Sequence, residues 1–399
     1  MNMQRSGART ALWIAGVCAL LPLVCVAIPM YVIRPFVPQE PRALDFALAV
    51  RHAGPFLSTA CVVVALVMVA WGWKQSSRVS VRSGLVLLLV VAVAGAWGTR
   101  FNIFEKMFHP YETPAFGSAD AAKVELDDKV IAVRFGGESR AYPIRTMGYH
   151  HIVNDTVGGV SVAVTYCTLC HTGIVWSRML DGRLLHFRLA GINNGNALLR
   201  DEETSSIWQQ STGEAIFGPL KGKQLTLLHS DELTFALWRG EQPQGKVLLP
   251  DEPYVAEYET KDWEKHIEST HVVVDTTGSA AAPHQLMLGI TAAGGSKAFP
   301  VQTVLRERVI GDVVGALPVV ILVGPDGASM RVFDGQGMTL TRGSQAGTMV
   351  DAETASVWNF QGCAVEGKKT GQCLREVEAH KDYWFDWMHH HPGTSVFKG

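Results

Sequence analysis

The sequence lacks the signatures of several large enzyme classes. It contains no glycine-rich phosphate loop between a strand and a helix, no Gly-x-Ser-x-Gly nucleophile elbow and no His-Glu-x-x-His zinc-protease motif. Kinase, dinucleotide-enzyme and hydrolase functions therefore have no support in the sequence. Whether the protein is an enzyme stays open.

Acidic residues outnumber basic residues outside the first hundred residues. Residues 1–100 contain nine Lys or Arg and two Asp or Glu, a net charge of +7, whereas the whole chain has a net charge of −2. Residues 101–399 therefore carry a net charge of −9. Such a domain repels phosphate backbones, and no stripe of basic and aromatic residues interrupts its acidic character. We expect no nucleic-acid partner.

Long apolar runs are present, and all lie near the N-terminus. They cover residues 11–33, 56–73 and 85–97. The first two reach the ~20 residues that a helix needs to cross a bilayer, and the third is shorter. A cleaved signal peptide is the alternative for the first run, but that run is too long and two more follow it. We therefore predict that residues 1–100 are a membrane anchor of three transmembrane helices, with the lipid bilayer as partner.

Charge and cysteine usage indicate the compartment. Arg5 and Arg9 precede the first run, and three basic residues lie between positions 74 and 82, which favours a cytoplasmic N-terminus. Three arginines in the first loop weaken that argument. Four cysteines outside the apolar runs form an even set, as an oxidising compartment permits. We predict a multi-pass protein of the cell inner membrane with a periplasmic soluble domain.

The soluble part contains an internal repeat. Residues 140–144 are echoed by 297–301, and residues 201–208 by 351–358. Each copy is rich in strand patterns, so the fold class predicted is a β-rich (α+β) soluble domain built from two repeated units after three transmembrane helices. We place the first unit at 101–240, a connecting segment at 241–286 and a second, degenerate unit at 287–399. The shared Asp201 and Trp208 are expected to cap a turn and to fill the core.

The most informative motif is Cys167-Thr168-Leu169-Cys170-His171, directly after an alternating strand pattern. A Cys-x-x-Cys pair exchanges disulfides, holds a soft metal or, with the following His, anchors haem c. The second unit has Gly324 and Gly327 at the matching positions, so the unit folds without these thiols. This asymmetry favours a functional site in the first unit over a structural staple.

The run from Ala141 to Leu225, with the C-terminal tail, resembles a bacterial family catalogued as domain of unknown function 3179. The residues that carry the resemblance are Ala141-Tyr142-Pro143, His150, Val153-Asn154-Asp155, Val164-Thr165-Tyr166-Cys167, Leu169-Cys170, Asn194, Asp201, Thr204, Trp208, Gly213, Gly218, Tyr383-Trp384-Phe385 and His391-Pro392. The resemblance covers most of residues 120–399. It implies redox or soft-metal chemistry at Cys167 and Cys170 with His171 optional, which weakens the haem interpretation.

Two functions of the thiol pair remain open from the sequence. In thiol–disulfide exchange, Cys167 attacks and Cys170 resolves; in metal binding, Cys167, Cys170, His171 and His150 are the candidate ligands for copper or zinc. A redox or metal-delivery protein would be the partner. For His150 a ring satisfied by backbone hydrogen bonds is an equal alternative. We expect both sulfurs to be close together, reachable from solvent and beside an imidazole nitrogen.

Two other classes of function are kept as alternatives. One is a non-catalytic binding or assembly module with a structural disulfide, and the other is a membrane-tethered c-type cytochrome, which we do not favour because flanking strands would crowd a porphyrin. For Cys363 and Cys373 we predict a structural disulfide. The polar loop 193–196 is read as a turn serving its own backbone rather than as a pocket wall, and the histidines at 389–391 as a solvated tract.

Overall fold

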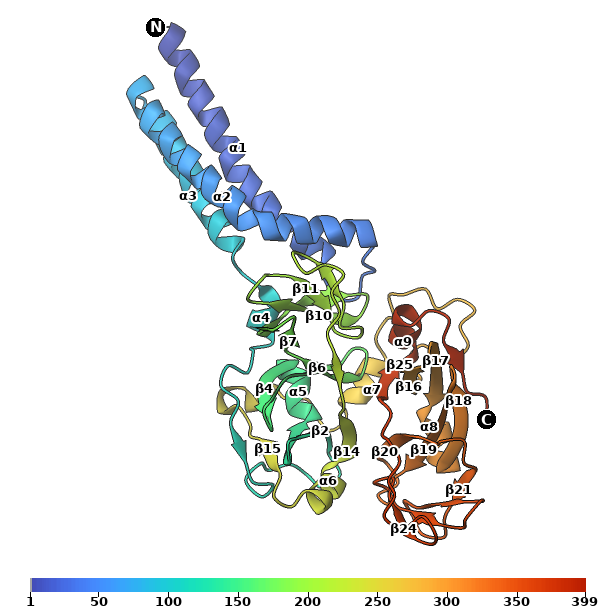
Figure 1. Cartoon of the computed structure of the whole chain (residues 1–399). Helices are drawn as coiled ribbons and strands as arrows, with labels where there is room; N and C mark the ends of the chain where they lie inside the picture. Colours follow the sequence, from blue (N-terminus) through green and yellow to red (C-terminus); the bar gives the residue numbers. More distant parts are fainter. Residues whose placement is uncertain (1) are drawn as a thin grey trace. The chain divides into compact units, whose positions relative to one another are not determined.

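Three long helices begin the structure, a computed structural model that describes residues 2–399. They are α1 (Asn2–Val32), α2 (Pro41–Gln75) and α3 (Val79–Gly98). Each contains a stretch long and apolar enough to cross a membrane, so the protein associates with membranes (Figure 1). The third helix has 20 residues, because it extends beyond the apolar run at both ends.

Small side chains line the contacts among these helices. Ala15 of α1, Ala65 of α2 and Ala92 of α3 are completely buried. Lipid tails are as apolar as leucine, so helices in a membrane associate by close backbone approach, which small residues permit. The chain divides into two compact units, and this helical unit continues through α4 (Ile103–Met107) and includes the segment Gly191–Asn193.

The second unit comprises Phe108–Ala190 and Asn194–Gly399 and is rich in strands (green to red in Figure 1). Its first sheet has the order β1-β15-β3-β2-β14. The strands are β1 (Phe116–Gly117), β2 (Lys129–Phe135), β3 (Glu138–Pro143), β14 (Asp231–Thr234) and β15 (Lys246–Leu248). Gly136 and Gly137 join β2 to β3 with φ of 54° and 80°, values that favour glycine. These two glycines therefore close an antiparallel hairpin of β2 and β3.

A second sheet carries the cysteine motif. Its order is β13-β6-β5-β4, from β4 (Ile152–Val157), β5 (Val160–Cys167), β6 (Thr172–Ser177) and β13 (Leu227–Leu228). Helix α5 (Ile144–His150) precedes it and ends at His151, whose φ is 60°. The predicted alternation along β5 is wrong at its end, because its last six residues are all buried. Strand β25 (His380–Tyr383) packs beside β6 and covers part of this sheet.

Shorter elements complete the first half. They are β7 (Met179–Leu180), β8 (Arg183–Leu184), β9 (Phe187–Asn193), β10 (Asn196–Asp201), β11 (Ile207–Gln209), β12 (Ala215–Phe217), helix α6 (Phe235–Glu241), the 3₁₀ helix η1 (Glu252–Glu257) and α7 (Trp263–Glu268). Strands β9 to β12 form one sheet in the order β12-β11-β10-β9, and β7 pairs with β8.

The second half has three small sheets. They are β25-β16-β17-β26, β18-β19-β20 and β21-β22-β23-β24. Their remaining members are β16 (Leu286–Ala292), β17 (Gly295–Pro300), β18 (Val309–Val314), β19 (Leu317–Val323), β20 (Met330–Asp334), β21 (Leu340–Arg342), β22 (Met349–Asp351), β23 (Val357–Trp358), β24 (Ala364–Glu366) and β26 (Ser395–Val396). Helix α8 (Val301–Glu307) follows β17, and α9 (Trp384–His390) follows β25.

Equivalent aspartates organise a turn in each half. Asp201 accepts hydrogen bonds from the backbone of Thr204 and Ser206 and from the indole of Trp208, at 2.8 Å for the last. Asp351 makes the same three bonds to Thr354, Ser356 and Trp358. Both tryptophans are buried. The predicted roles of these residues, capping and core filling, are confirmed.

One apolar cluster includes residues of both halves. Val130, Leu233 and Trp238 pack there with Val320 and Phe333, and all five are buried. The two halves of the second unit therefore share a core.

A disulfide between Cys363 and Cys373, which lie 10 residues apart in the sequence, closes the loop that contains β24.

Candidate functional site

The cysteine motif closes the hairpin between β5 and β6. Cys167 is the last residue of β5 and lies opposite Thr172, the first residue of β6. We call residues 167–171 the Cys turn. His171 ends it with a φ of 60°, and its N–H donates to the Thr168 carbonyl oxygen at 3.3 Å. Both cysteines are free thiols.

The thiols are buried, contrary to the expectation that solvent would reach them. Cys167 is 4% exposed and Cys170 is 0% exposed. The reason is the C-terminal segment of the second half: the Tyr383 N–H, where β25 ends, donates to the Cys170 carbonyl oxygen at 2.8 Å. This main-chain bond fixes the Cys turn against the start of α9.

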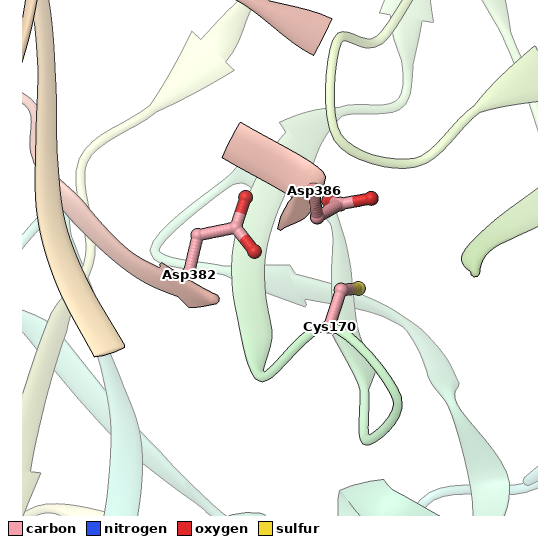
Figure 2. A group of neighbouring side chains, drawn as sticks. All are labelled: Cys170, Asp382 and Asp386. Atoms are coloured by element: carbon pink, nitrogen blue, oxygen red, sulfur yellow. The ribbon is translucent and has the colours of Figure 1, made fainter. Parts of the chain in front are cut away.

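Two aspartates accompany Cys170 in this contact. Asp382 lies in β25 and Asp386 in the first turn of α9. The Cys170 sulfur and one carboxylate oxygen from each aspartate lie within 4.8 Å of one another. Figure 2 shows the three side chains approaching from the Cys turn, β25 and α9. We call Cys170, Asp382 and Asp386 the thiol–carboxylate cluster.

Neutral polar groups hold the cluster in place. The Asn196 amide nitrogen lies 3.1 Å from the Cys170 sulfur and 3.0 Å from Asp386 Oδ2. The Thr172 hydroxyl donates to Asp382 Oδ1 at 2.8 Å. Asn196 belongs to the polar loop at 193–196, so this loop does contact the cysteine site, and its interpretation as a turn serving only its own backbone is wrong.

The cluster combines burial with incomplete hydrogen bonding. All three side chains have 0% exposure. Among the described residues no N–H group donates to Asp382 Oδ2 or Asp386 Oδ1; the two carboxyls interact with each other, and His390 Nε2 lies 3.5 Å from Asp386 Oδ1. A buried carboxylate without full hydrogen bonding is costly. The side chain of His390 is 9% exposed, whereas His389 is exposed, so the expectation of a solvated tract fits His389 but not the His390 ring.

Burial raises the pKa of all three acidic groups. It raises the pKa of the Cys170 thiol well above its usual value, with further contributions from Cys167 and Asp386. It also raises the pKa of the Asp382 carboxyl, where the nearby Asp386 adds to the effect, and that of Asp386 itself. The site therefore retains protons unless a cation takes their place.

The two histidines named from the sequence have other partners. His171 Nε2 lies 2.8 Å from Glu264 Oε1, its Nδ1 lies 3.2 Å from the Tyr166 hydroxyl, and its ring stacks on Trp263. His150 uses Nδ1 for the His109 carbonyl oxygen at 2.7 Å and Nε2 for the Tyr258 hydroxyl at 3.2 Å. Their role as metal ligands with Cys167 and Cys170 stays a prediction, and these hydrogen bonds compete with it.

The sequence reasoning missed Asp382 and Asp386. They flank Tyr383-Trp384-Phe385, which is part of the family resemblance. Nothing in the sequence connects the two aspartates to the Cys turn, about 210 residues earlier.

A cavity of about 700 Å³ lies elsewhere in the second unit. Its charged lining is largely paired internally: Arg331 binds Asp231 and Glu241, and His229 binds Glu376 and Glu378. These groups have little capacity left to orient a ligand. We therefore place the chemistry at the thiol–carboxylate cluster.

Comparison with known proteins gives one match. A family model described as "Protein of unknown function (DUF3179)" matches residues 110–394. No curated protein and no solved structure matches the chain significantly.

Proposed function

The chain belongs to the DUF3179 family, and from its own geometry we propose that it is a membrane-anchored metal-binding protein. The metal centre is the thiol–carboxylate cluster of Cys170, Asp382 and Asp386. One observation carries this proposal: three buried acids lie within 4.8 Å of one another, and two of their oxygens receive no hydrogen bond from an N–H group among the described residues. A divalent cation would satisfy both oxygens and neutralise the charge that burial opposes.

The ligand atoms favour zinc or copper. Thiolate sulfur selects zinc, copper and iron–sulfur centres over magnesium or calcium, and carboxylate oxygens are common zinc ligands beside sulfur. Binding would displace the protons that the raised pKa values retain, so affinity should rise with pH. A metal-delivery protein is the partner that such a site would need.

Thiol–disulfide exchange is less well supported. The reactive species is a thiolate, but burial and neighbouring carboxyls raise the pKa of the Cys170 thiol. A partner disulfide would also need access to Cys167, which is 4% exposed. A structural staple in the Cys turn is disfavoured because both thiols are free. Haem attachment is disfavoured because β25 and α9 cover the turn.

The two halves of the soluble unit are proposed to be copies of one unit. Strand orders β15-β3-β2-β14 and β26-β17-β16-β25 agree, and in both sheets the edge pair β15–β3 or β26–β17 is parallel. The paired Asp201 and Asp351 turns support the same proposal. We also propose an inner-membrane location with this unit in the periplasm, supported by the Cys363–Cys373 disulfide.

Metal analysis of the purified full chain tests the proposed function. After exposure to Zn²⁺ or copper and removal of unbound ions, we expect about one ion per chain by elemental mass spectrometry, because the cluster has room for one set of ligands. Asp386→Asn and Cys170→Ser should each lower the bound metal severalfold.

Asp334→Asn is the matched control, because this carboxylate pairs with Arg375 outside the cluster. It should leave the metal content unchanged. A wild-type chain that binds neither zinc nor copper, with free thiols verified by titration, would contradict the proposal.

A further inference from the structure

The thiol–carboxylate cluster has three ligand residues, whereas zinc-type sites usually have four ligands. We infer that Cys167 is the fourth ligand, so that the ion binds two sulfurs from the first half and two carboxylates from the second. This inference rests on the proposed metal-binding function. It makes the bound ion a cross-link between the halves of the soluble unit.

The position of Cys167 supports this role. Cys167 and Cys170 belong to the same Cys turn, where the Cys170 thiol lies 3.9 Å from the Cys167 carbonyl oxygen. The Cys167 sulfur lies 3.6 Å from the Gly195 carbonyl oxygen, one residue before Asn196, whose amide contacts the cluster.

A second, independent observation comes from the equivalent place in the other half. Strand β14 pairs Leu233 with Val130, which faces Pro143; strand β25 pairs Asp382 with Met287, which faces Pro300. Leu233 therefore corresponds to Asp382. Helices α6 and α9 begin two residues later in each case, so Leu237 corresponds to Asp386.

The turn that faces α6 is built like the Cys turn. Strands β4 and β5 pair Ile152 with Thr165, and β18 and β19 pair Val309 with Leu322, which aligns Gly324 with Cys167 and Gly327 with Cys170. A side chain added at Gly324 would meet Phe360 at 3.2 Å and Leu237 at 3.3 Å. The same elements therefore pack together at this sister position.

Six polar or thiol residues of the cysteine site are replaced together at the sister position, where a different acid, Asp326, accepts from the Thr234 and Ser329 hydroxyls. Six residues of the cysteine site correspond to glycine or apolar residues there: Cys167 to Gly324, Cys170 to Gly327, Asn196 to Ala346, Gln210 to Phe360, Asp382 to Leu233 and Asp386 to Leu237. The sister position shows that the fold needs none of them. Joint replacement is expected of residues that serve one ligand, and Cys167 is among them.

Cobalt substitution tests whether Cys167 is a ligand. Full-length protein in detergent is loaded with Co²⁺, and the near-ultraviolet sulfur-to-cobalt absorption is measured. Because each thiolate contributes to this band, Cys167→Ser should retain cobalt but lose about half of the intensity. Cys61→Ser, which removes a free thiol from α2, is the control and should leave the band unchanged.

The two ideas fail in different ways. Wild-type protein that binds no cobalt or zinc would overturn the metal-binding function itself. Cobalt binding with an undiminished band in Cys167→Ser would leave that function intact and overturn the fourth ligand.

Hydrogen exchange tests the cross-link between the halves. Zinc should slow amide exchange at least several-fold both in the Cys turn and in α9, because the ion would join them. Helix α6, the counterpart of α9 at the sister position, should exchange at the same rate with and without zinc. Slowing in the Cys turn alone would overturn the cross-link, and Asp386→Asn should abolish the slowing in α9.

Discussion

At the scale of single residues, Asp201 is the clearest stabilising group. Its buried carboxylate accepts two backbone N–H bonds and the Trp208 indole N–H. Asp201→Ala leaves these donors unpaired in the interior, so we expect a loss of about 2–4 kcal/mol in the free energy of unfolding. Denaturant unfolding followed by tryptophan fluorescence measures it. Asp201→Asn keeps one oxygen and should lose less; equal stability of the wild type and Asp201→Ala would contradict the assignment.

His229 gives the molecule a pH dependence on the alkaline side. Burial alone would lower the pKa of His229, but hydrogen bonds to Glu376 and Glu378 and the charge of Asp231 outweigh it and raise the pKa to about 10. A raised pKa in the folded state contributes stability that is fully present below the unfolded value, near 6.5, and is lost as pH rises through about 10.

The melting temperature should therefore fall between pH 7 and pH 10 by more in the wild type than in His229→Gln. Thermal unfolding at a series of pH values measures the difference. Parallel curves for the two proteins would show that the ion pairs of His229 carry no pH-dependent stability.

The sequence identifies the two cysteines of the site but not the aspartates that lie beside Cys170. Cys167 and Cys170 were identifiable because a Cys-x-x-Cys pair is local and chemically distinctive. Asp382 and Asp386 were not, because their contact with Cys170 is created by tertiary packing in a chain with 37 acidic residues. For His150, the hydrogen bond to the His109 carbonyl agrees with the backbone-satisfied alternative.

At the scale of elements, the Cys363–Cys373 disulfide stabilises the end of the second half. It closes a loop of 10 residues, and the chain-entropy model gives about 3 kcal/mol for a loop of this size. A Cys363→Ser, Cys373→Ser double variant should lose stability of this order in denaturant unfolding. Reductant should destabilise the wild type by a similar amount and leave the double variant unaffected.

Local patterns predicted elements better than their boundaries. The Gly136-Gly137 hairpin was predictable because few residues other than glycine accept those φ values. Helix α5 ends at His150, because His151 takes a left-handed conformation and Ile152 begins β4, and no residue type in this stretch marks that boundary. Residues distant in the sequence contact the end of β5: Gln210 donates to the Thr165 hydroxyl, and the Cys167 sulfur lies 3.6 Å from the Gly195 carbonyl oxygen, so no local pattern reports this burial.

At the scale of the whole molecule, an odd number of spans places the two ends of the chain on opposite sides of the membrane. Three candidate spans are present, and basic residues before the first favour a cytoplasmic N-terminus. An alkaline phosphatase fusion after Gly399 should therefore be active in a bacterial host, because that enzyme matures only in the periplasm. A cytoplasmic reporter at the same position should be inactive; the reverse pattern would overturn the proposed orientation.

Membrane association and family membership were accessible from the sequence because each depends on contiguous patterns. The thiol–carboxylate cluster was not, because its residues come from segments that only folding brings together.

The bond from the Tyr383 N–H to the Cys170 carbonyl has a consequence for how the protein is made. About 210 residues separate the thiols from the aspartates that cover them, so at 5–20 residues per second the ribosome needs roughly 10–40 s to supply the second half. Throughout that interval the nascent chain exposes two uncovered thiols. An oxidant or metal ion that meets these thiols during synthesis therefore reacts with them before the aspartates are present to cover them.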